Sequence, residues 1–279
     1  MKFRKRIMAA AMTVAMAVAM VGCNGNNGSD NAEKGLDPET LLKTANETMA
    51  NVESFSADMN MTFDMEMAEE KASTEIVAKM EAMTNPLKLK MDMSTKMNGE
   101  EMQAYQMYAM QDGETATSYI NVGGQWAKQS ISVDDLAQYN AEQNMDLYLN
   151  NLSNFSATGS ETINGKETTI IEGVLTGDAM KEAMKNSGLE SATAGMGMSV
   201  DEVVSMIEGD MPVKLWITED GYVMQYDLNM TQMMQSLMDG MAKGQDLNLK
   251  VSNVNIKMTC DNYNAIENIE LPAEAQSAA

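Results

Sequence analysis

The side chains that could carry out chemistry in this chain are thiols, thioethers and carboxylates, because its 279 residues include no histidine. His-based acid–base catalysis, the Ser-His-Asp and Cys-His nucleophile arrangements and the usual zinc sites are therefore excluded. Chemistry with two carboxylates, such as glycoside hydrolysis, needs one positioned pair, and the spacing of the 41 acidic residues singles out none. We therefore expect no catalytic residues, no metal centre and no cofactor, and a protein that is not an enzyme.

Cys23 is the residue whose surroundings predict a specific modification. Four basic residues within the first six precede an uncharged run of sixteen residues from Ile7 to Gly22. This pattern is typical of a secretory signal, and the run is shorter than the roughly 20 residues of a membrane-spanning helix. The sequence Met20-Val21-Gly22-Cys23 resembles the lipobox of bacterial lipoproteins, in which the thiol receives a diacylglycerol. The alternatives are an ordinary secreted protein with a chance cysteine, or an uncleaved anchor.

On the lipoprotein interpretation, residues 1–22 are a signal peptide and Cys23 becomes the lipid-bearing N-terminus, on the extracytoplasmic face of the cell membrane. Residues 24–36 are mostly Asn, Gly, Ser and charged residues, with little apolar area to bury, so we expect 23–36 to be a flexible tether. Beyond residue 22 the chain has 15 basic against 41 acidic residues, a formal charge of −26. This charge excludes nucleic acid as a partner, since binding it requires clustered Lys and Arg. It also means that the membrane must be held through the lipid.

The remaining cysteine, Cys260, has no partner for an intramolecular disulfide once Cys23 is lipidated. It continues an alternating pattern of Val254, Ile256 and Met258. A lone thiol at such a position is usually a small buried hydrophobe, so we expect Cys260 to be buried and inert rather than reactive.

The elements that must position these side chains are mainly β-strands. A first helix is predicted from Pro38, with Asp37 as its cap, to about residue 52. Apolar and polar residues then alternate over long stretches, first around Met59–Met67 and again around Leu87–Met93, which predicts strands with one wet face. Five tight turns are predicted between strand-like segments, at Asn98-Gly99, Asp112-Gly113, Gly123-Gly124, Asn164-Gly165 and Asp220-Gly221. Together they predict an antiparallel meander.

Further helices are expected within this meander, near residues 133–150, after Gly177 and over 199–208. Residues 231–243 can extend the preceding strand or form a short helix, and we favour the helix. We expect the phase of the last long strand to slip at Ser252-Asn253, as a β-bulge would make it do. Trp216 is out of phase with Leu215 and Ile217, so it should face outward, against a helix. In all, we predict about nine to eleven strands in one domain over residues 37–272, with 273–279 as a disordered tail.

Three stretches together resemble a known family. They are Val52-Glu-Ser-Phe-Ser56 leading into long strands, the hairpin from Val213 to Met224, and the closing segment from Asp261 to Pro272. They are similar to a family of uncharacterised lipoproteins from Gram-positive bacteria, which in turn is similar to the LolA/LolB and LppX/LprG group of lipid and lipoprotein carriers. The resemblance implies an α+β fold: a single strongly curved antiparallel sheet (a LolA-like half-barrel) with helices packed on its concave face. In the carriers an apolar cavity between sheet and helices takes acyl chains, and no catalytic residues transfer.

Methionine is the most unusual feature of the composition, with 27 of 32 methionines beyond residue 22. Three interpretations remain open. Methionine can replace Leu and Ile as core filler; it can form a deformable lining for lipid tails; or, less favoured, its thioethers can bind Cu(I). The candidate lining for a lipid or other apolar ligand is Met59, Met61, Phe63, Met65, Leu89, Met91, Met93, Tyr222, Met224 and Tyr226. We thus expect a membrane-anchored lipoprotein that binds or carries an apolar ligand, or alternatively an envelope interaction or structural module that binds none.

Overall fold

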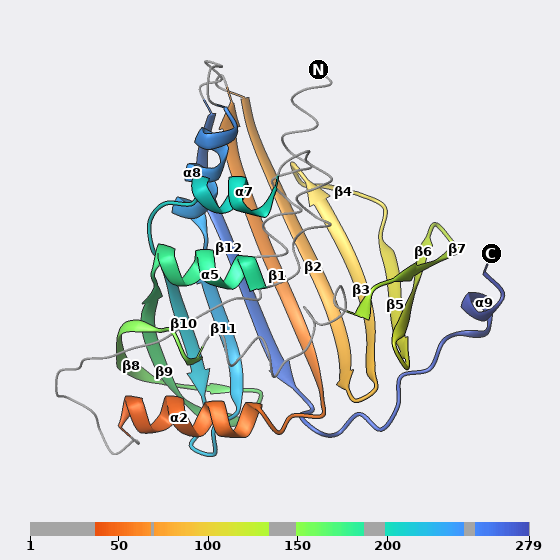
Figure 1. The fold of residues 1–279 in the computed structure, drawn as a ribbon, viewed down its shortest axis with the longest axis horizontal. Helices are drawn as coiled ribbons and strands as arrows, with labels where there is room; N and C mark the ends of the chain where they lie inside the picture. Colours follow the sequence, from red (N-terminus) through yellow and green to blue (C-terminus); the bar gives the residue numbers. More distant parts are fainter. Residues whose placement is uncertain (1–36, 68–69, 134–148, 187–198, 243–248, 279) are drawn as a thin grey trace.

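A computed structural model describes residues 37–67, 70–133, 149–186, 199–242 and 249–278. Its strands form one twelve-stranded antiparallel sheet in the order β7-β6-β5-β3-β2-β1-β12-β11-β10-β9-β8, with β4 paired to β3 outside this path (Figure 1). The strands are β1 (Ser54–Met67), β2 (Glu70–Thr84), β3 (Leu87–Met97), β4 (Glu100–Glu101), β5 (Tyr105–Asp112), β6 (Thr115–Val122), β7 (Gln125–Ile131), β8 (Ser153–Ile163), β9 (Lys166–Leu175), β10 (Met211–Ile217), β11 (Val223–Asn229) and β12 (Leu249–Asp261).

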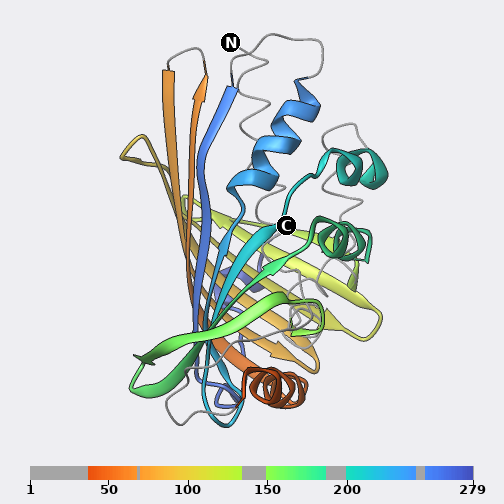
Figure 2. The same cartoon turned by 90° about the vertical axis from the view of Figure 1, so that its left-hand side faces the viewer.

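The sheet is open and strongly curved, and helices lie on its concave side (Figure 2). They are α2 (Pro38–Met49), α5 (Gly177–Asn186), α7 (Val200–Met206) and α8 (Thr231–Met241). Helix α8 packs along β12, α7 packs against α8, and α5 packs against α7. We call the concave side the inner face and the convex side the outer face. The predicted fold class is confirmed.

The five predicted turns all connect paired, successive strands. At Asn98-Gly99 and Asn164-Gly165 both residues have positive φ (53° and 83°, 49° and 78°), which two-residue hairpins of type I′ require. The local sequence therefore decides these connections, because few residues other than Asn and Gly adopt the left-handed conformation at low cost.

The predicted bulge in the last strand is also present. Asp64 of β1 pairs with Asn253, whereas Met65 pairs with Val251, so Ser252 is the extra residue. Two residues now oppose one, and this brings Val251 to the same face as Val254. Both are buried in the main core.

Helices α2 and α7 begin at the capping residues that the sequence predicted. The Asp37 side chain accepts a hydrogen bond from the backbone amide of Thr40 (3.1 Å). The Ser199 hydroxyl accepts one from the amide of Glu202 (3.2 Å), while the Glu202 carboxylate accepts one from the amide of Ser199 (2.8 Å). This second pair is a complete capping box. The helix expected over 231–243 is confirmed as α8.

Three expectations differ from the structure or lie outside it. The sheet has twelve strands rather than nine to eleven, because the two-residue β4 adds to an eleven-strand path. Residues 273–278 are not a disordered tail: Ala273–Gln276 form helix α9, and Ala275 is buried. The helix predicted near 133–150 falls mostly on residues 134–148, outside the described part of the chain. Within the described part, no helix is long and apolar enough to cross a membrane.

Candidate apolar ligand site on the inner face

The predicted lining residues of β1 and β3 come together on the inner face. Six of the seven are buried and Met59 is partly buried, and all belong to or pack against one apolar core with residues of α2, α5, α7 and α8. The shared face follows from the period of two along each strand. These residues are Met59, Met61, Phe63, Met65, Leu89, Met91 and Met93.

The sheet register arranges them in rows that run across the strands. In one row, Met258 of β12 pairs with Met59, which pairs with Ala78, which pairs with Met93. In the next row, Met80 of β2 pairs with Met91, which pairs with Met107 of β5. Direct cross-strand neighbours have Cβ atoms about 4.5–5.5 Å apart. The inner face over β12, β1, β2, β3 and β5 is therefore a continuous surface rich in thioethers.

Sequence reasoning missed three methionines of this surface, Met80, Met107 and Met258. The alternation of Val254, Ile256 and Met258 predicts a strand but does not connect Met258 with the site. Met80 lies within residues 76–83, which alternate less clearly, and Met107 within a run of aromatic and methionine residues. These residues are identified by the methionines that they pair with on the next strand. Those pairings depend on strand order, which the sequence pattern does not give.

Two tyrosines border the methionine surface. The Tyr105 hydroxyl donates to Met93 Sδ (2.7 Å), and the Tyr226 hydroxyl donates to Met258 Sδ (2.7 Å). Burial raises the pKa of both phenols, that of Tyr226 well above its ordinary value. Both therefore stay protonated at neutral pH and act as donors in otherwise apolar surroundings.

The three predicted lining residues around β11, Tyr222, Met224 and Tyr226, do not lie on one face of the sheet. Tyr226 lies on the inner face, but Met224 is fully buried in a small outer-face cluster with Ile163 and Trp216. The reason is a bulge: Trp216 pairs with Gln225, whereas Ile217 pairs with Val223, which leaves Met224 without a partner and reverses its side. The predicted assignment of Met224 to the ligand-lining face is therefore wrong: its side chain lies on the outer face.

Tyr222 lies between the two clusters and packs against both. Its ring stacks on Tyr263 at a centroid distance of 5.0 Å, and the Lys166 ammonium lies 5.4 Å from its centroid. It is therefore not a member of the methionine surface.

Trp216 faces outward, as its phase predicted, but it packs against strands rather than a helix. Its indole Nε1 donates to Glu161 of β8 (2.7 Å), and the ammonium groups of Lys214 and Lys257 lie 5.9 and 5.7 Å from its ring centroid. These long side chains cover the ring, so it is buried although none of the described helices lies over it.

Cys260 is buried on the inner face, as expected. Burial raises the pKa of its thiol to about 12. Since the thiolate is the reactive species, this burial keeps Cys260 unreactive at neutral pH.

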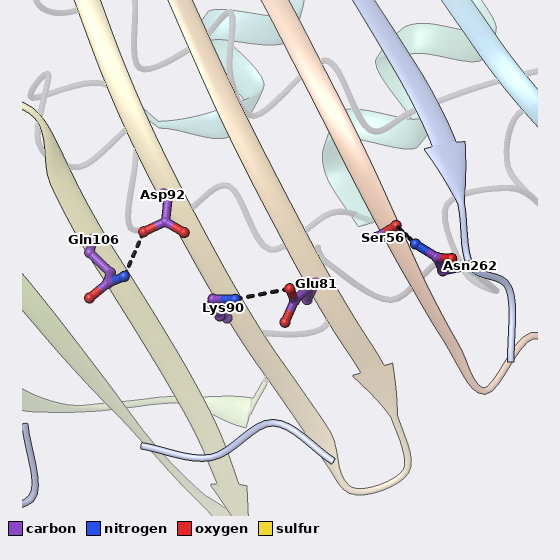
Figure 3. A network of polar contacts seen from close by, with 6 residues as sticks. All are labelled: Ser56, Glu81, Lys90, Asp92, Gln106 and Asn262. Carbon is purple, nitrogen blue, oxygen red and sulfur yellow. Dashed lines mark hydrogen bonds and ion pairs between the residues drawn. The ribbon is translucent and has the colours of Figure 1, made fainter. Parts of the chain in front are cut away.

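The outer face of β1–β5 carries a polar network that sequence reasoning did not assign (Figure 3). Lys90 pairs with Glu81 (2.9 Å), the Gln106 amide donates to Asp92 (2.6 Å), and the Asn262 amide donates to Ser56 (2.9 Å). A hollow of about 280 Å³ lies beside these residues. The two lysines in its wall, Lys79 and Lys90, are paired with Asp58 and Glu81. These ion pairs link neighbouring strands and offset both lysine charges.

Two larger hollows are lined by described residues. One of about 540 Å³ lies over β2, β3, β5 and β6, and its wall includes Lys79, Asp92 and Gln106 of the outer face together with Met93 and Tyr105. The other, of about 620 Å³, lies between α2 and the start of β8. Neither lies between the methionine surface and helices α5, α7 and α8, where the methionines pack as part of the core. Among the described residues, no group of three His, Cys, Asp or Glu side chains is placed to hold a metal ion.

The chain belongs to a family described as a family of unknown function (DUF6612), which it matches over residues 37–279. No curated protein is significantly similar to it in sequence. Similar solved structures include the lipoprotein LppX from Mycobacterium tuberculosis, at 15% identity and a TM-score of 0.45, covering 83% of this chain and 97% of that chain.

A second is LprF from Mycobacterium bovis, at 12% identity and a TM-score of 0.44, covering 85% of this chain and 96% of that chain. A third is a domain from Vibrio parahaemolyticus described as an outer membrane lipoprotein-sorting protein, at 13% identity and a TM-score of 0.23, covering 83% and 92%. The sequence predicted a resemblance to an uncharacterised family and to LppX and the lipoprotein-sorting proteins. These comparisons find both.

Proposed function

We propose that this protein is a lipoprotein, anchored to the membrane through Cys23, that binds a lipid or other apolar ligand on the inner face of its sheet. In this proposal the protein binds its ligand and catalyses no reaction. The signal-like N-terminus and the lipobox-like sequence support the anchor. The methionine surface supports the ligand.

The observation that carries the proposal is the concentration of methionine where the sheet and its helices meet. Met59 and Met61 of β1 and Met91 and Met93 of β3 lie on the same face, with β2 and its Met80 between them. Met258 and Met107 extend this surface onto β12 and β5. Unbranched thioether side chains change conformation at low cost and adapt to guests of irregular shape. An acyl chain can be accommodated there if the methionines move aside, so a preformed empty cavity is not required.

The experiment is a titration of the purified chain with a dansyl-labelled fatty acid, whose emission rises in an apolar site. We expect saturable binding by the wild-type protein that unlabelled fatty acid displaces. Met91→Ala should change the affinity, because Met91 lies in the middle of the methionine surface. The matched control is Met224→Ala, which removes a buried methionine from the outer face and should leave binding unchanged.

The alternative is an envelope interaction or structural module without a ligand. The burial of Met61, Met91 and Met93 favours it, since such residues serve equally well as core. It predicts no saturable binding of the fatty acid, and no co-purifying lipid in native mass spectra of protein taken from its own host. Either positive result would decide for the carrier.

A further inference from the structure

One row of the inner face combines sulfur-bearing side chains from four strands. Cys260 of β12 pairs with Ala57 of β1, Ala57 pairs with Met80, Met80 pairs with Met91, and Met91 pairs with Met107. The last three are thioethers on adjacent strands with no other residue between them. Ala57 separates them from the thiol.

The spacing of this row suits one shared ion. Adjacent strands lie about 4.7–4.9 Å apart, so the Cβ atoms of Met80 and Met107 stand about 10 Å apart with that of Met91 between them. Each sulfur lies two bonds beyond Cβ and can lean sideways along the row. The sheet is concave on this side (Figure 2), and side chains that rise from a concave face converge. Three sulfurs can thus reach one point above Met91.

We propose that Met80, Met91 and Met107 form a three-thioether site for a soft monovalent metal ion, Cu(I). Thioethers select Cu(I) over hard divalent cations. The chain has no histidine to compete for the ion, and its negative field concentrates cations around it. Met80 and Met91 are buried, whereas Met107 is partly exposed, so its end of the row is the side from which the ion enters.

A site made of thioethers has a property that distinguishes it from other sites in the same protein. Thioether sulfur carries no proton, so no ligand has to be deprotonated before the ion binds. The affinity for Cu(I) should therefore stay constant between pH 5 and 8. A site that used the Cys260 thiol would weaken as pH falls.

The test is an anaerobic competition for Cu(I) between the purified protein and the chromophoric chelator bicinchoninate. We expect one Cu(I) per chain with sulfur scatterers alone in its X-ray absorption spectrum. Met91→Leu and Met107→Leu keep the side-chain volume and the apolar character, so the fold should survive. Each should weaken binding by about tenfold or more, the range seen even for outer-shell metal partners.

Two controls address other sulfur atoms. Met234→Leu removes a fully buried methionine of α8, a helix whose side chains hydrogen-bond to β12 at Val251 and Val254. Cys260→Ser removes the thiol. Both variants should bind Cu(I) like the wild type. The proposal is overturned if the protein fails to compete with bicinchoninate. It is equally overturned if Met91→Leu and Met107→Leu bind normally, or if Cys260→Ser abolishes binding. Fatty-acid binding is measured separately, so failure of this site leaves the proposed carrier function standing.

Discussion

The Tyr226 hydroxyl donates a 2.7 Å hydrogen bond to the Sδ of Met258, its direct neighbour on β12. Tyr105 makes the same contact with Met93 at the opposite side of the methionine surface. A thioether is a weak acceptor, and each phenol donates to one in largely apolar surroundings. The two pairs mark the borders of the surface on β11 and β5.

Burial of Tyr226 and Cys260 predicts a loss of stability at alkaline pH. Both groups have a raised pKa in the folded chain, about 12 for the Cys260 thiol against an ordinary value of 9.0. Above pH 9 the unfolded chain therefore releases protons that the folded chain keeps, and the free energy of unfolding falls as pH rises toward 12. Urea titrations at pH 7, 9 and 10.5 should show this. Cys260→Ala should flatten the decline; an unchanged slope would contradict the assignment.

The turn of the β10–β11 hairpin packs closely against α2 at Gly221, which predicts that this position does not tolerate a side chain. Its φ is +90°, and a Cβ there would lie 2.6 Å from the Thr44 carbonyl oxygen and from Thr48 Oγ1. Gly165 has a similar φ of +78° but open space around it. Gly221→Ala should therefore cost about 1–3 kcal/mol more than Gly165→Ala, because only the first adds overpacking to backbone strain. If urea titrations show the same loss of unfolding free energy for both variants, α2 moves aside without strain and the prediction is wrong.

The capping box of α7 predicts a moderate effect of one hydroxyl. Ser199→Ala removes the acceptor for the amide of Glu202, and such losses cost about 0.5–2 kcal/mol. The Ser205 hydroxyl donates to the Glu202 carbonyl oxygen within the same helix, so Ser205→Ala should cost less. Thermal unfolding of both variants beside the wild type measures the difference, and the reverse order would refute the capping role.

Truncation of the methionine surface distinguishes core from ligand lining. If Met61 and Met91 serve only as core, Met61→Ala and Met91→Ala should each lower the free energy of unfolding by roughly 2–5 kcal/mol. If the surface is loosely packed until a ligand arrives, the cost should be below ~1.5 kcal/mol, with a change in fatty-acid binding instead. Full core-like costs together with no binding would retire the carrier proposal.

Loss of the Cys23 thiol should prevent lipidation. We expect Cys23→Ala to be released into the medium or to accumulate as unprocessed precursor in the membrane. Cell fractionation with immunodetection measures both outcomes. Normal cleavage with continued membrane attachment would show that the anchor is something other than a lipid on this residue.

The sequence predicted the local elements well because their causes are local. Alternation of Met61, Phe63 and Met65 with polar neighbours indicated a strand and its buried side, and Asn164-Gly165 indicated a hairpin turn. The slip at Ser252 was visible as a change of phase within one segment. The short helix α9 was not predicted, because four residues with Pro272 before them give too little periodic signal.

What only the tertiary structure decided is which side chains meet. β1 lies between β2 and β12, so Met59 contacts Met258 across almost the whole length of the chain. No pattern along the sequence encodes that pairing. Met224 shows the same limit: its phase matches Tyr226, yet a bulge in the β10–β11 register moves it to the outer face with Trp216. Sequence periodicity fixes which residues of a strand share a face, whereas strand order and register, set by packing of the whole sheet, fix their neighbours across it.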